Sequence, residues 1–316
     1  MYRLGIDLGG TNIAAGVINT DHQIIGRAKI KTNAARPAED IIYDIAQAAR
    51  TAVSDAGLSM EQISHIGVAA PGSVNPQTGV ITYANNLPFR HTPVGEMLTN
   101  LLGMPCTVGN DANVAAYGEW MAGAGQGART LIAVTLGTGV GGGVIIDGKI
   151  YDGFNHIGAE LGHMIIQYDG EMCTCGTKGC WEAYASATAL IRQTRTAMEQ
   201  ERESAMWEIC GGDLAQVSGR TAFDAMRAGD PAGTRVVDQY IGYIACGLVS
   251  IINIFQPQYI CIGGGICNEG DTLMIPLKEK VYRNIYNRNA QPEDQTVILR
   301  AALGNDAGII GAALLE

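Results

Sequence analysis

Residues 2–18 read Tyr-Arg-Leu-Gly-Ile-Asp-Leu-Gly-Gly-Thr-Asn-Ile-Ala-Ala-Gly-Val-Ile, which is an apolar stretch, a Leu-Gly turn and a second apolar stretch. A strand, a tight glycine turn and a returning strand are typical of a β-hairpin. A similar pattern recurs about 127 residues later, where Thr130–Leu136 leads through a glycine-rich turn into Gly143-Val144-Ile145. The recurrence predicts two halves of the chain that are built on one plan.

Helical segments and a third strand follow these hairpins. Tyr259–Ile262 predicts an apolar strand that leaves through Gly263–Gly265. We expect helices in five segments, namely Pro37–Ala56, Asn110–Ala124, Ala183–Arg202, Pro231–Phe255 and Ala307–Leu315. Strands that alternate with helices predict an α/β fold with central sheets. The run of small residues at Gly123–Gly127 marks the expected break between two domains.

The composition is that of a compact protein. The chain has 316 residues, which is comfortable for two domains, with 47% apolar and 16% charged residues. Its net charge is −10, whereas a nucleic-acid partner requires clustered Lys and Arg to neutralise phosphates. The sequence therefore argues against a nucleic-acid partner.

Two features predict a cytoplasmic protein without a membrane span. Gln239–Asn268 carries no charged residue, but Asn253 and Gln256-Pro257-Gln258 divide it into a predicted buried helix and a short strand. The N-terminus runs directly into the first strand with no basic and apolar signal segment, and five cysteines lie singly, mostly in apolar surroundings. We therefore expect reduced thiols and a cytoplasmic location.

One imidazole and three thiols are spaced to close on a single metal ion. They are His163, Cys173, Cys175 and Cys180. A structural zinc site takes four nitrogen or sulfur ligands in a tetrahedron, and this set supplies them. Gly176 and Gly179 let the backbone turn tightly enough for the thiols to face inward. An ordinary hairpin with scattered thiols is the alternative, but the close spacing favours zinc.

Three glycine turns at strand ends are candidate phosphate sites. They lie at Gly9–Thr11, Gly137–Gly143 and Gly263–Gly265. Such turns bring backbone N–H groups close to an anion, with no Cβ in the way. Asp7 at the end of the first strand adds a carboxylate that could hold a Mg²⁺ bridging phosphate oxygens. A single glycine turn is a weak motif, but three turns, one of them beside an aspartate, favour a nucleotide.

The segment Gly109-Asn110-Asp111-Ala112-Asn113 precedes an Ala-rich helix. Asp111 or Asn110 could cap the start of this helix, and an aspartate at such a position can be a mere cap. It can also accept a proton from a substrate hydroxyl that attacks a γ-phosphate, while Asn110 orients the same substrate. Glu160, His163 and Glu182 supply further acceptors that suit vicinal hydroxyls. Together these side chains indicate a sugar.

With these motifs the chain resembles the ROK group of sugar kinases and repressors, within the actin-like ATPase superfamily. The resemblance covers essentially the whole length and runs through Leu4–Thr11, Ala69–Gly72, Asn110–Asn113, Leu136–Gly143, the zinc motif, Gly263–Gly265 and Leu303–Gly308. It implies a two-domain actin-like ATPase (ribonuclease H-like) α/β fold, with the active site in the interdomain cleft and a zinc-binding loop over residues 163–180. We expect the N-terminal α/β domain over residues 1–122, joined by a C-terminal helix at 303–316, and the C-terminal α/β domain over 123–302.

The resemblance also implies roles for individual residues in an ATP-dependent hexose kinase. Asp111 would be the catalytic base, and His163 would contact both zinc and sugar. The expected sugar-binding residues are Asn86, Asn110, Asp111, Glu160, His163 and Glu182. The expected ATP and Mg²⁺ residues are Asp7, Gly9, Gly10, Thr11, Asn12, Gly137, Thr138, Gly139, Gly264 and Gly265. Many relatives continue with Gly-Trp after Asn86, whereas this chain has Pro88-Phe89 and so departs from the family's pattern on that side.

The sugar, and the choice between enzyme and sensor, stay open in the sequence. Phosphorylation of glucose at its 6-hydroxyl is expected first, because the pattern is most similar to the glucokinase members from Gram-positive bacteria. N-acetylmannosamine, fructose, mannose and allose require the same residue set. A sugar-sensing repressor would carry an N-terminal helix-turn-helix, whereas this chain begins at its first strand, has no basic patch and retains Asp111. The group also implies a homodimer or homotetramer, with no membrane partner.

Overall fold

The computed structural model describes residues 1–315, which form two compact units. Unit 1 contains Met1–Ala133, Gly142–Ala159 and the residues from Ala301 onward. Unit 2 contains Val134–Gly141 and Glu160–Arg300. Neither unit is therefore one continuous stretch of the chain.

The first sheet begins with the predicted N-terminal hairpin. Its strand order is β3 (Ile24–Lys31), β2 (Asn12–Ile18), β1 (Tyr2–Leu8), β4 (Ile63–Ala70) and β8 (Cys106–Asn110). β1 pairs antiparallel with β2, which confirms the hairpin. It pairs parallel with β4, and β4 pairs parallel with β8. The carboxyl ends of these three parallel strands therefore share one edge of the sheet.

The second sheet repeats this strand order. It runs β11 (Lys149–Ile150), β10 (Val140–Ile146), β9 (Thr130–Leu136), β12 (Tyr259–Gly263) and β13 (Val297–Arg300). Both sheets place a hairpin next to two strands from later in the chain, and β12 pairs parallel with β13 as β4 does with β8. The shared order confirms the prediction of two halves built on one plan.

Helices complete both units. Unit 1 contains α1 (Ala38–Asp55), α2 (Val94–Leu102), α3 (Asp111–Ala122) and α10 (Ala307–Leu314), with a small sheet of β5 (Ser73–Asn75), β6 (Val80–Tyr83) and β7 (Arg90–Thr92). Unit 2 contains α4 (Glu182–Ala185), α5 (Ala187–Gln200), α6 (Met206–Ile209), α7 (Thr221–Arg227), α8 (Pro231–Phe255) and α9 (Asp271–Asn284). Short 3-10 helices lie at Met60–Gln62, Leu161–His163, Leu214–Gln216, Gly265–Glu269, Pro292–Asp294 and Gly304–Asp306. The helices predicted at 37–56, 110–124, 231–255 and 307–315 are confirmed, with ends within two residues.

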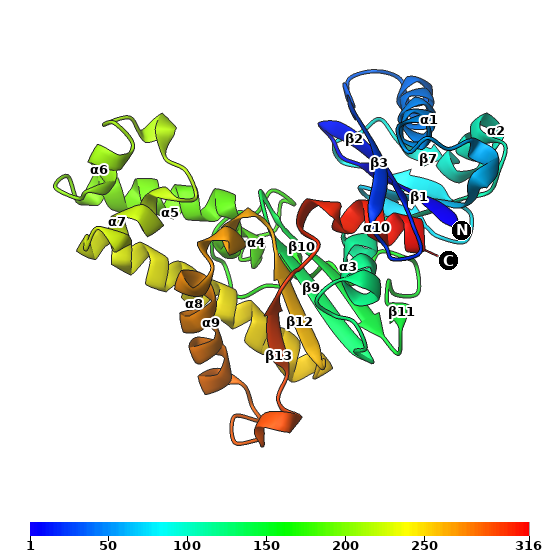
Figure 1. The fold of residues 1–316 in the computed structure, drawn as a ribbon. Helices are drawn as coiled ribbons and strands as arrows, with labels where there is room; N and C mark the ends of the chain where they lie inside the picture. Colours follow the sequence, from blue (N-terminus) through cyan, green and yellow to red (C-terminus); the bar gives the residue numbers. More distant parts are fainter. Residues whose placement is uncertain (316) are drawn as a thin grey trace. The chain divides into compact units, whose positions relative to one another are not determined.

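A row of glycines lets α10 lie directly on the first sheet (Figure 1). Gly16, Gly5 and Gly67 pair side by side on β2, β1 and β4. A Cβ at Gly5 would lie 1.8 Å from the carbonyl oxygen of Ile309, and one at Gly67 would lie 1.9 Å from that of Ala312. Any side chain in this row would push α10 off the sheet. Because α10 also packs along α3, it supports that helix as well.

The prediction of a single helix over 183–202 is wrong. α4 ends at Ala185, and α5 begins at Ala187. Between them, Ser186 has an extended backbone, and its hydroxyl oxygen accepts a hydrogen bond from the Ala189 N–H. Serine is a strong N-cap residue, so a new helix starts here. The break also directs the Ala187 N–H to the carbonyl oxygen of Gly137.

α8 is the predicted buried helix that precedes the third strand. It ends at Phe255, where Gln256 takes left-handed angles with a φ of 43°, and β12 begins at Tyr259. Among residues 1–315, α8 alone is long and apolar enough to cross a membrane, but half of its most apolar window is buried. Its buried side packs against α7, α9 and α5, as in the core helix of a folded domain.

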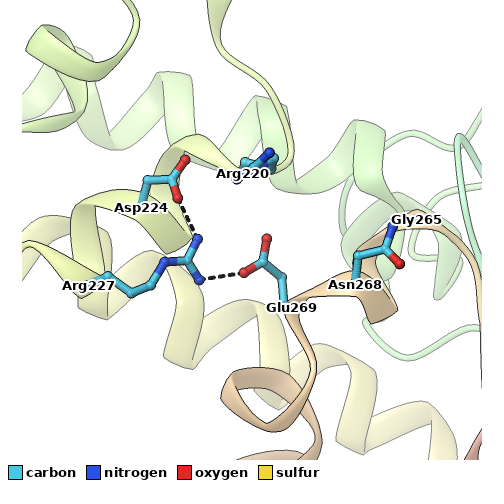
Figure 2. A pocket seen from close by; sticks show the side chains of 6 residues that line it. All are labelled: Arg220, Asp224, Arg227, Gly265, Asn268 and Glu269. Carbon is cyan, nitrogen blue, oxygen red and sulfur yellow. Dashed lines mark hydrogen bonds and ion pairs between the residues drawn. The ribbon is translucent and has the colours of Figure 1, made fainter.

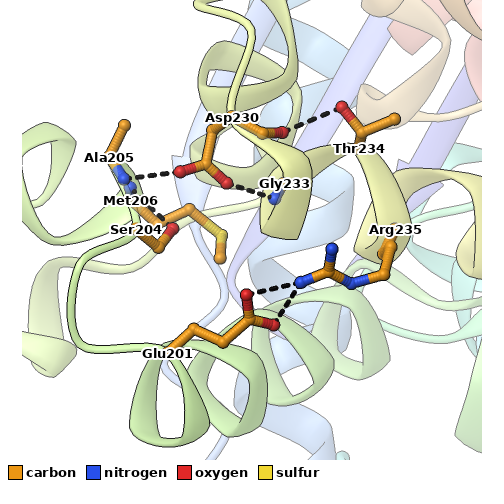
Figure 3. A network of polar contacts seen from close by, with 8 residues as sticks. All are labelled: Glu201, Ser204, Ala205, Met206, Asp230, Gly233, Thr234 and Arg235. Atoms are coloured by element: carbon orange, nitrogen blue, oxygen red, sulfur yellow. Dashed lines mark hydrogen bonds and ion pairs between the residues drawn. The ribbon is translucent and has the colours of Figure 1, made fainter.

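The segment between α5 and α7, where the sequence shows no motif, is tied to the start of α8 (Figure 3). Asp230 accepts hydrogen bonds from the N–H groups of Gly233 and Ala205, each at 2.7 Å. Burial opposes ionisation of this carboxyl, but the backbone hydrogen bonds outweigh burial and hold the pKa of Asp230 below its usual value. Arg235 on α8 also pairs with Glu201. These contacts give the segment a structural role.

A buried carboxylate on α3 binds three backbone N–H groups from two other segments of unit 1. Glu119 Oε2 accepts hydrogen bonds from the N–H groups of Ala124 and Ala302, both at 3.0 Å. Its Oε1 accepts one from the Leu303 N–H at 2.8 Å. Its backbone carbonyl accepts two more from the run Gly123–Gly127. The glycine run is therefore a tight turn fixed by Glu119.

Candidate functional site

Polar side chains gather at the carboxyl edge of the first sheet in unit 1. Asp7 lies near the end of β1, and Asn110 ends β8. β4 lies between these two strands, with Ala69 beside Asp7 and Ala70 beside Asn110. In open α/β sheets, ligands bind outside the carboxyl ends of parallel strands. This edge is therefore the candidate site of unit 1.

Asp111 begins α3 directly after β8. Asn110 caps the helix, because its side-chain oxygen accepts a hydrogen bond from the Asn113 N–H at 3.1 Å. The amide nitrogen of Asn110 donates to the carbonyl oxygen of Gly72 at 3.1 Å, which fixes the side chain from its other end. Asp111 is half-buried, and its Oδ1 accepts a hydrogen bond from the Ala112 N–H at 2.8 Å. The capping role thus belongs to Asn110, so capping does not explain Asp111.

Asp7 is the acidic group beside the first glycine turn. Burial raises the pKa of its carboxyl above the usual value. Gly308, in the first turn of α10, lies against it, since a Cβ there would be 2.9 Å from the carboxyl carbon. A carboxylate in such surroundings is stabilised by a nearby divalent cation. Mg²⁺ prefers carboxylate oxygens as ligands, and the burial of the Asp7 carboxylate favours a cation beside it. Asp7 therefore fits a Mg²⁺ site.

The first glycine turn joins β1 to β2 and is supported from the core. The Gly9 N–H donates to the carbonyl oxygen of Asn12 at 2.9 Å, which closes the turn. Thr32 is fully buried, and its hydroxyl donates to the carbonyl oxygen of Gly9 at 2.6 Å. The Thr32 N–H donates to the carbonyl oxygen of Thr11 at 3.0 Å. One buried residue therefore fixes both sides of the turn, through its side chain and its backbone N–H.

Asn86, a predicted sugar-binding residue, lies beside the first turn. A Cβ at Gly10 would be 3.6 Å from the Cβ of Asn86. Phe89 on the same loop is fully buried, and Arg90 donates to the carbonyl oxygens of Ala84 and Phe89 at 2.7 and 2.6 Å. Phe89 therefore anchors this loop in the core, and its ring is not presented to a ligand.

The second and third glycine turns lie side by side in unit 2. The Gly137 N–H donates to the carbonyl oxygen of Gly139 at 3.0 Å. A Cβ at Gly264 would lie 2.2 Å from the carbonyl oxygen of Leu136, and the φ of Gly264 is 96°. Only glycine satisfies both conditions. The structure therefore brings Gly137–Gly139 and Gly264–Gly265 together.

A cavity of about 450 Å³ opens beside the third glycine turn (Figure 2). Its lining residues are Arg220, Asp224, Arg227, Gly265, Asn268 and Glu269. The guanidinium of Arg227 is held between two carboxylates, at 2.6 Å from Glu269 and 2.5 Å from Asp224. The volume is in the range of small-molecule sites. Sequence reasoning missed Arg220 and Asn268, because only the neighbouring glycines form a motif.

The four predicted metal ligands form one cluster. Their ligand atoms all lie within 4.8 Å of one another. Cys173 Sγ is 3.7 Å from His163 Nδ1, and Cys175 Sγ is 3.6 Å from Cys180 Sγ. Zinc–sulfur bonds of about 2.3 Å in a tetrahedron separate two sulfurs by about 3.8 Å, so the cluster fits zinc. A hydrogen bond from the backbone of Thr177 lowers the pKa of Cys175 to about 7, so its thiolate is available near neutral pH.

The loop that carries the cluster has the backbone that its glycines predict. Gly176 and Gly179 have φ values of 87° and 85°, which confirms that glycine makes these turns. Trp181, next to the last ligand, is fully buried, and its Nε1–H donates to the carbonyl oxygen of Tyr243 on α8 at 2.8 Å. His163 presents Nδ1 to the cluster, so with a metal bound there its Nε2 carries the proton and can donate elsewhere.

Two predicted sugar-binding carboxylates flank the cluster. Glu160 is exposed and directly precedes the 3-10 helix Leu161–His163. Glu182 begins α4, and its Oε2 accepts a hydrogen bond from the Val140 N–H at 3.0 Å. Its Oε1 accepts one from the Thr174 hydroxyl at 3.0 Å. Each carboxylate oxygen has a second lone pair, so these contacts still allow a sugar hydroxyl to donate. Sequence reasoning did not anticipate the bond to Val140.

The predicted residues thus fall into two sets, one in each unit. Unit 1 holds Asp7, Gly9, Gly10, Thr11, Asn12, Asn86, Asn110 and Asp111. Unit 2 holds Gly137, Thr138, Gly139, Glu160, His163, Cys173, Cys175, Cys180, Glu182, Gly264 and Gly265. The first glycine turn belongs to the set of unit 1, and the second and third belong to the set of unit 2.

Comparisons with known proteins agree with these motifs. The chain matches the model of the ROK family over residues 3–316. It is 36% identical over 311 residues to a glucokinase of Thermotoga maritima, covering 98% of this chain and 95% of that protein. It is 35% identical over 312 residues to a glucokinase of Streptomyces coelicolor, covering 98% and 96%. Among solved structures, a ROK family glucokinase from Streptomyces griseus in complex with glucose and AMPPNP is similar, with a TM-score of 0.83, 34% identity and coverage of 100% of this chain and 99% of that one.

Proposed function

This chain belongs to the ROK family, and on that premise we propose that it is a glucokinase, an enzyme that transfers the γ-phosphoryl group of ATP to the 6-hydroxyl of glucose. Its α/β sheets are those of the actin-like ATPase fold. One structural observation supports the proposed kinase chemistry most directly. Asp7 lies near the end of β1, beside a glycine turn, and Asp111 directly follows β8 at the same sheet edge, where it begins the helix that Asn110 caps.

The chain's own residues supply a base and a set of anion donors. The carboxylate of Asp111 accepts the proton of the 6-hydroxyl as that oxygen attacks the γ-phosphorus in line, and ADP leaves. Backbone N–H groups of the turns at Gly9–Thr11 and Gly137–Gly139 hold the charge that develops on the phosphoryl oxygens. Asp7 would hold Mg²⁺, and the ion would supply positive charge to neutralise the phosphates. The raised pKa of Asp7 and the chemistry of its oxygens support this assignment.

Sugar recognition is assigned to amide, carboxylate and imidazole groups, each able to bond a hydroxyl. They are Asn86, Asn110, Asp111, Glu160, His163 and Glu182. The position of Asn86 beside Gly10 and the fixed amide of Asn110 support their part in this set. His163 contributes Nε2–H as a donor, because its Nδ1 faces the metal cluster. The resemblance of the sequence motifs to the ROK family is the reason for grouping these six.

The nucleotide is assigned to the glycine turns and the cavity beside them. Phosphates lie on Gly9–Asn12 and Gly137–Gly139, and the nucleoside lies by Gly264–Gly265 in the cavity of about 450 Å³. The AMPPNP complex of the similar glucokinase supports ATP as donor. An Arg220→Ala variant should raise the KM for ATP several-fold and leave the KM for glucose unchanged. An unchanged KM for ATP would remove the nucleoside from this cavity.

The Cys/His cluster is assigned to structural zinc. The tetrahedral spacing of its ligand atoms supports zinc over a larger, oxygen-loving cation. Cys175→Ser should remove the metal, measured by elemental analysis of the purified protein, and should weaken glucose binding through the loop that bears Glu160 and Glu182. Full activity in a zinc-free variant would make the metal a bystander.

ADP release with MgATP tests the enzyme and its sugar together. The rates are compared for glucose, N-acetylmannosamine, fructose, mannose and allose, with Asp111→Ala as the blank. We expect the highest kcat/KM with glucose. A preference for another hexose would keep the kinase and change its sugar. No turnover with any of the five, together with tight sugar binding, would contradict the kinase and support a sugar sensor.

We also propose the cellular compartment and the oligomeric state of the enzyme. The cytoplasm supplies ATP and keeps thiols reduced, and none of the eight cysteines, which all lie within residues 1–315, forms a disulfide. We assign the enzyme to that compartment and to a homodimer or homotetramer. Light scattering behind a sizing column gives the mass of the assembly, and a monomer at assay concentration would contradict the second assignment.

A further inference from the structure

The second glycine turn, Gly137–Gly139, accepts hydrogen bonds from residues that lie a few positions after the metal hairpin, which we define as Cys173–Cys180. The Ala187 N–H donates to the carbonyl oxygen of Gly137 at 2.8 Å. The Thr188 hydroxyl donates to the carbonyl oxygen of Thr138, also at 2.8 Å. Both donors lie in the first turn of α5, shortly after the last metal ligand. The backbone of the turn therefore depends on the segment that leaves the metal site.

Glu182 joins the metal site to the same turn through one carboxylate. Its Oε2 accepts a hydrogen bond from the Val140 N–H, at the first residue of β10. Its Oε1 accepts one from the Thr174 hydroxyl and lies 3.5 Å from Cys173 Sγ. Thr174 stands between two of the metal ligands in the sequence. The carboxylate thus spans the distance from the metal hairpin to the end of the glycine turn.

The other end of the metal loop, residues 163–180, also lies next to Val140. A Cβ at Gly162 would lie 2.1 Å from the carbonyl oxygen of Val140, so the turn that carries His163 packs directly on Val140. Trp181 precedes Glu182 and is fixed in the core of unit 2. Residues at both ends of the metal loop therefore contact Val140, which directly follows the turn Gly137–Gly139.

From these contacts we propose that Glu182 is a positioning residue that couples the metal site to the glycine turn Gly137–Gly139, so that a filled metal site strengthens nucleotide binding. The inference rests on the proposed function in one respect, that this turn holds nucleotide phosphate. A bound metal fixes the hairpin and with it the Thr174 hydroxyl that orients Glu182. When the metal is removed, the Val140 N–H loses its charged acceptor, and hydrogen bonds to charged acceptors are the stronger ones.

Hydrogen–deuterium exchange tests the coupling without nucleotide or sugar. Removal of the metal by a chelator should speed exchange at Val140 by roughly tenfold or more in the wild-type protein. In Glu182→Ala, exchange at Val140 should already be fast with the metal bound, and chelation should add little. Unchanged exchange at Val140 in wild-type protein whose metal loss has been verified overturns the proposal.

Two variants serve as controls for a general loss of structure. Thr188→Val removes the hydrogen bond to the Thr138 carbonyl oxygen and leaves Glu182 and its contacts in place. Exchange at Val140 in this variant should therefore still respond to chelation. Thr174→Val keeps every metal ligand and the carboxylate but removes the hydroxyl that orients it, so its response should be smaller than that of the wild type. If Glu182→Ala fails to fold, the comparison of these two variants decides, and equal responses overturn the proposal.

Calorimetric titration with AMPPNP, again without sugar, gives the second readout. The Kd should rise roughly tenfold when the wild-type protein loses its metal, and should change little in Glu182→Ala. Equal affinity with and without the metal overturns the coupling and leaves the kinase assignment standing. No binding of AMPPNP to the metal-loaded protein, with exchange at Val140 still sensitive to chelation, refutes the nucleotide site and leaves the coupling standing.

Discussion

The two hairpin turns share a strand plan but differ in what they carry. In the first sheet the strand leads into the turn through Asp7-Leu8-Gly9, and in the second through Thr135-Leu136-Gly137. When the two Leu-Gly pairs are aligned, the exposed Thr135 stands where the first copy has the half-buried Asp7. Both copies therefore keep a strand that enters a glycine turn, but only the first has a carboxylate there.

The two turns also differ in what holds them. The first turn is held by Thr32, which is fully buried at the end of β3. The second is held by Glu182 and the start of α5, which belong to the metal loop and its exit. The first support is a buried threonine of the core, whereas the second lies next to the predicted metal ligands. If the proposed coupling holds, only the second turn responds to the metal.

The largest expected effect comes from Asp111, the proposed catalytic base in unit 1. Asp111→Ala should lower kcat by about 10²–10⁴, which is the usual contribution of a general base. Glucose affinity, measured by calorimetry, should fall far less, because five other side chains are assigned to the sugar. A coupled assay of ADP release gives kcat. Turnover near the wild-type rate would exclude Asp111 as the base. It would also contradict the proposal that unit 1 supplies the acid–base chemistry.

The matched pair Asp7→Asn and Thr135→Val tests the divergence of the two turns directly. Asp7→Asn should lower kcat/KM for MgATP by about a hundredfold, because a metal ion contributes several kcal/mol to such a reaction. Thr135→Val changes an exposed side chain and should stay within about twofold. Titration with Mg²⁺ should show a raised requirement for the first variant only. Equal effects at both positions would contradict the assignment of the metal to unit 1.

Asp7 should also control how stability depends on pH. Because its pKa is raised in the folded protein, the carboxyl stays protonated at pH values where the unfolded chain has already released its proton. The folded state then binds more protons, so the free energy of unfolding of the Mg²⁺-free protein falls as pH rises through the folded pKa. Asp7→Asn removes this loss and should raise the thermal midpoint at neutral pH, measured without Mg²⁺. Identical midpoints for both proteins at neutral pH would contradict the raised pKa.

The sequence predicted the features that depend on local pattern. The repeated Leu-Gly turn identified both hairpins, and the spacing of His163 and Cys173–Cys180 identified the metal cluster. Asn110-Asp111 was placed at a helix start, although the sequence left open which of the two is the cap. Each of these features joins residues that are neighbours along the chain, where turn and capping preferences decide the structure.

The features that the sequence did not predict depend on register between distant segments. The glycine row beneath α10 forms only because Gly5, Gly16 and Gly67 fall into line across three strands. The break at Ser186 becomes useful because the Ala187 N–H finds a carbonyl on another hairpin. Periodicity cannot report such contacts, since it describes one element at a time.

The smallest expected effects come from the threonines that support each turn. Thr32→Val leaves the partly buried carbonyl oxygen of Gly9 without its hydroxyl partner, so the free energy of unfolding should fall by about 1–3 kcal/mol. Thr188→Val exposes the carbonyl oxygen of Thr138 to water, which replaces the lost donor, and the loss should stay within about 0.5 kcal/mol. Urea unfolding of the metal-loaded proteins measures both. Equal losses would mean that the second turn is as firmly built into its unit as the first, and a turn held that firmly could not respond to the metal.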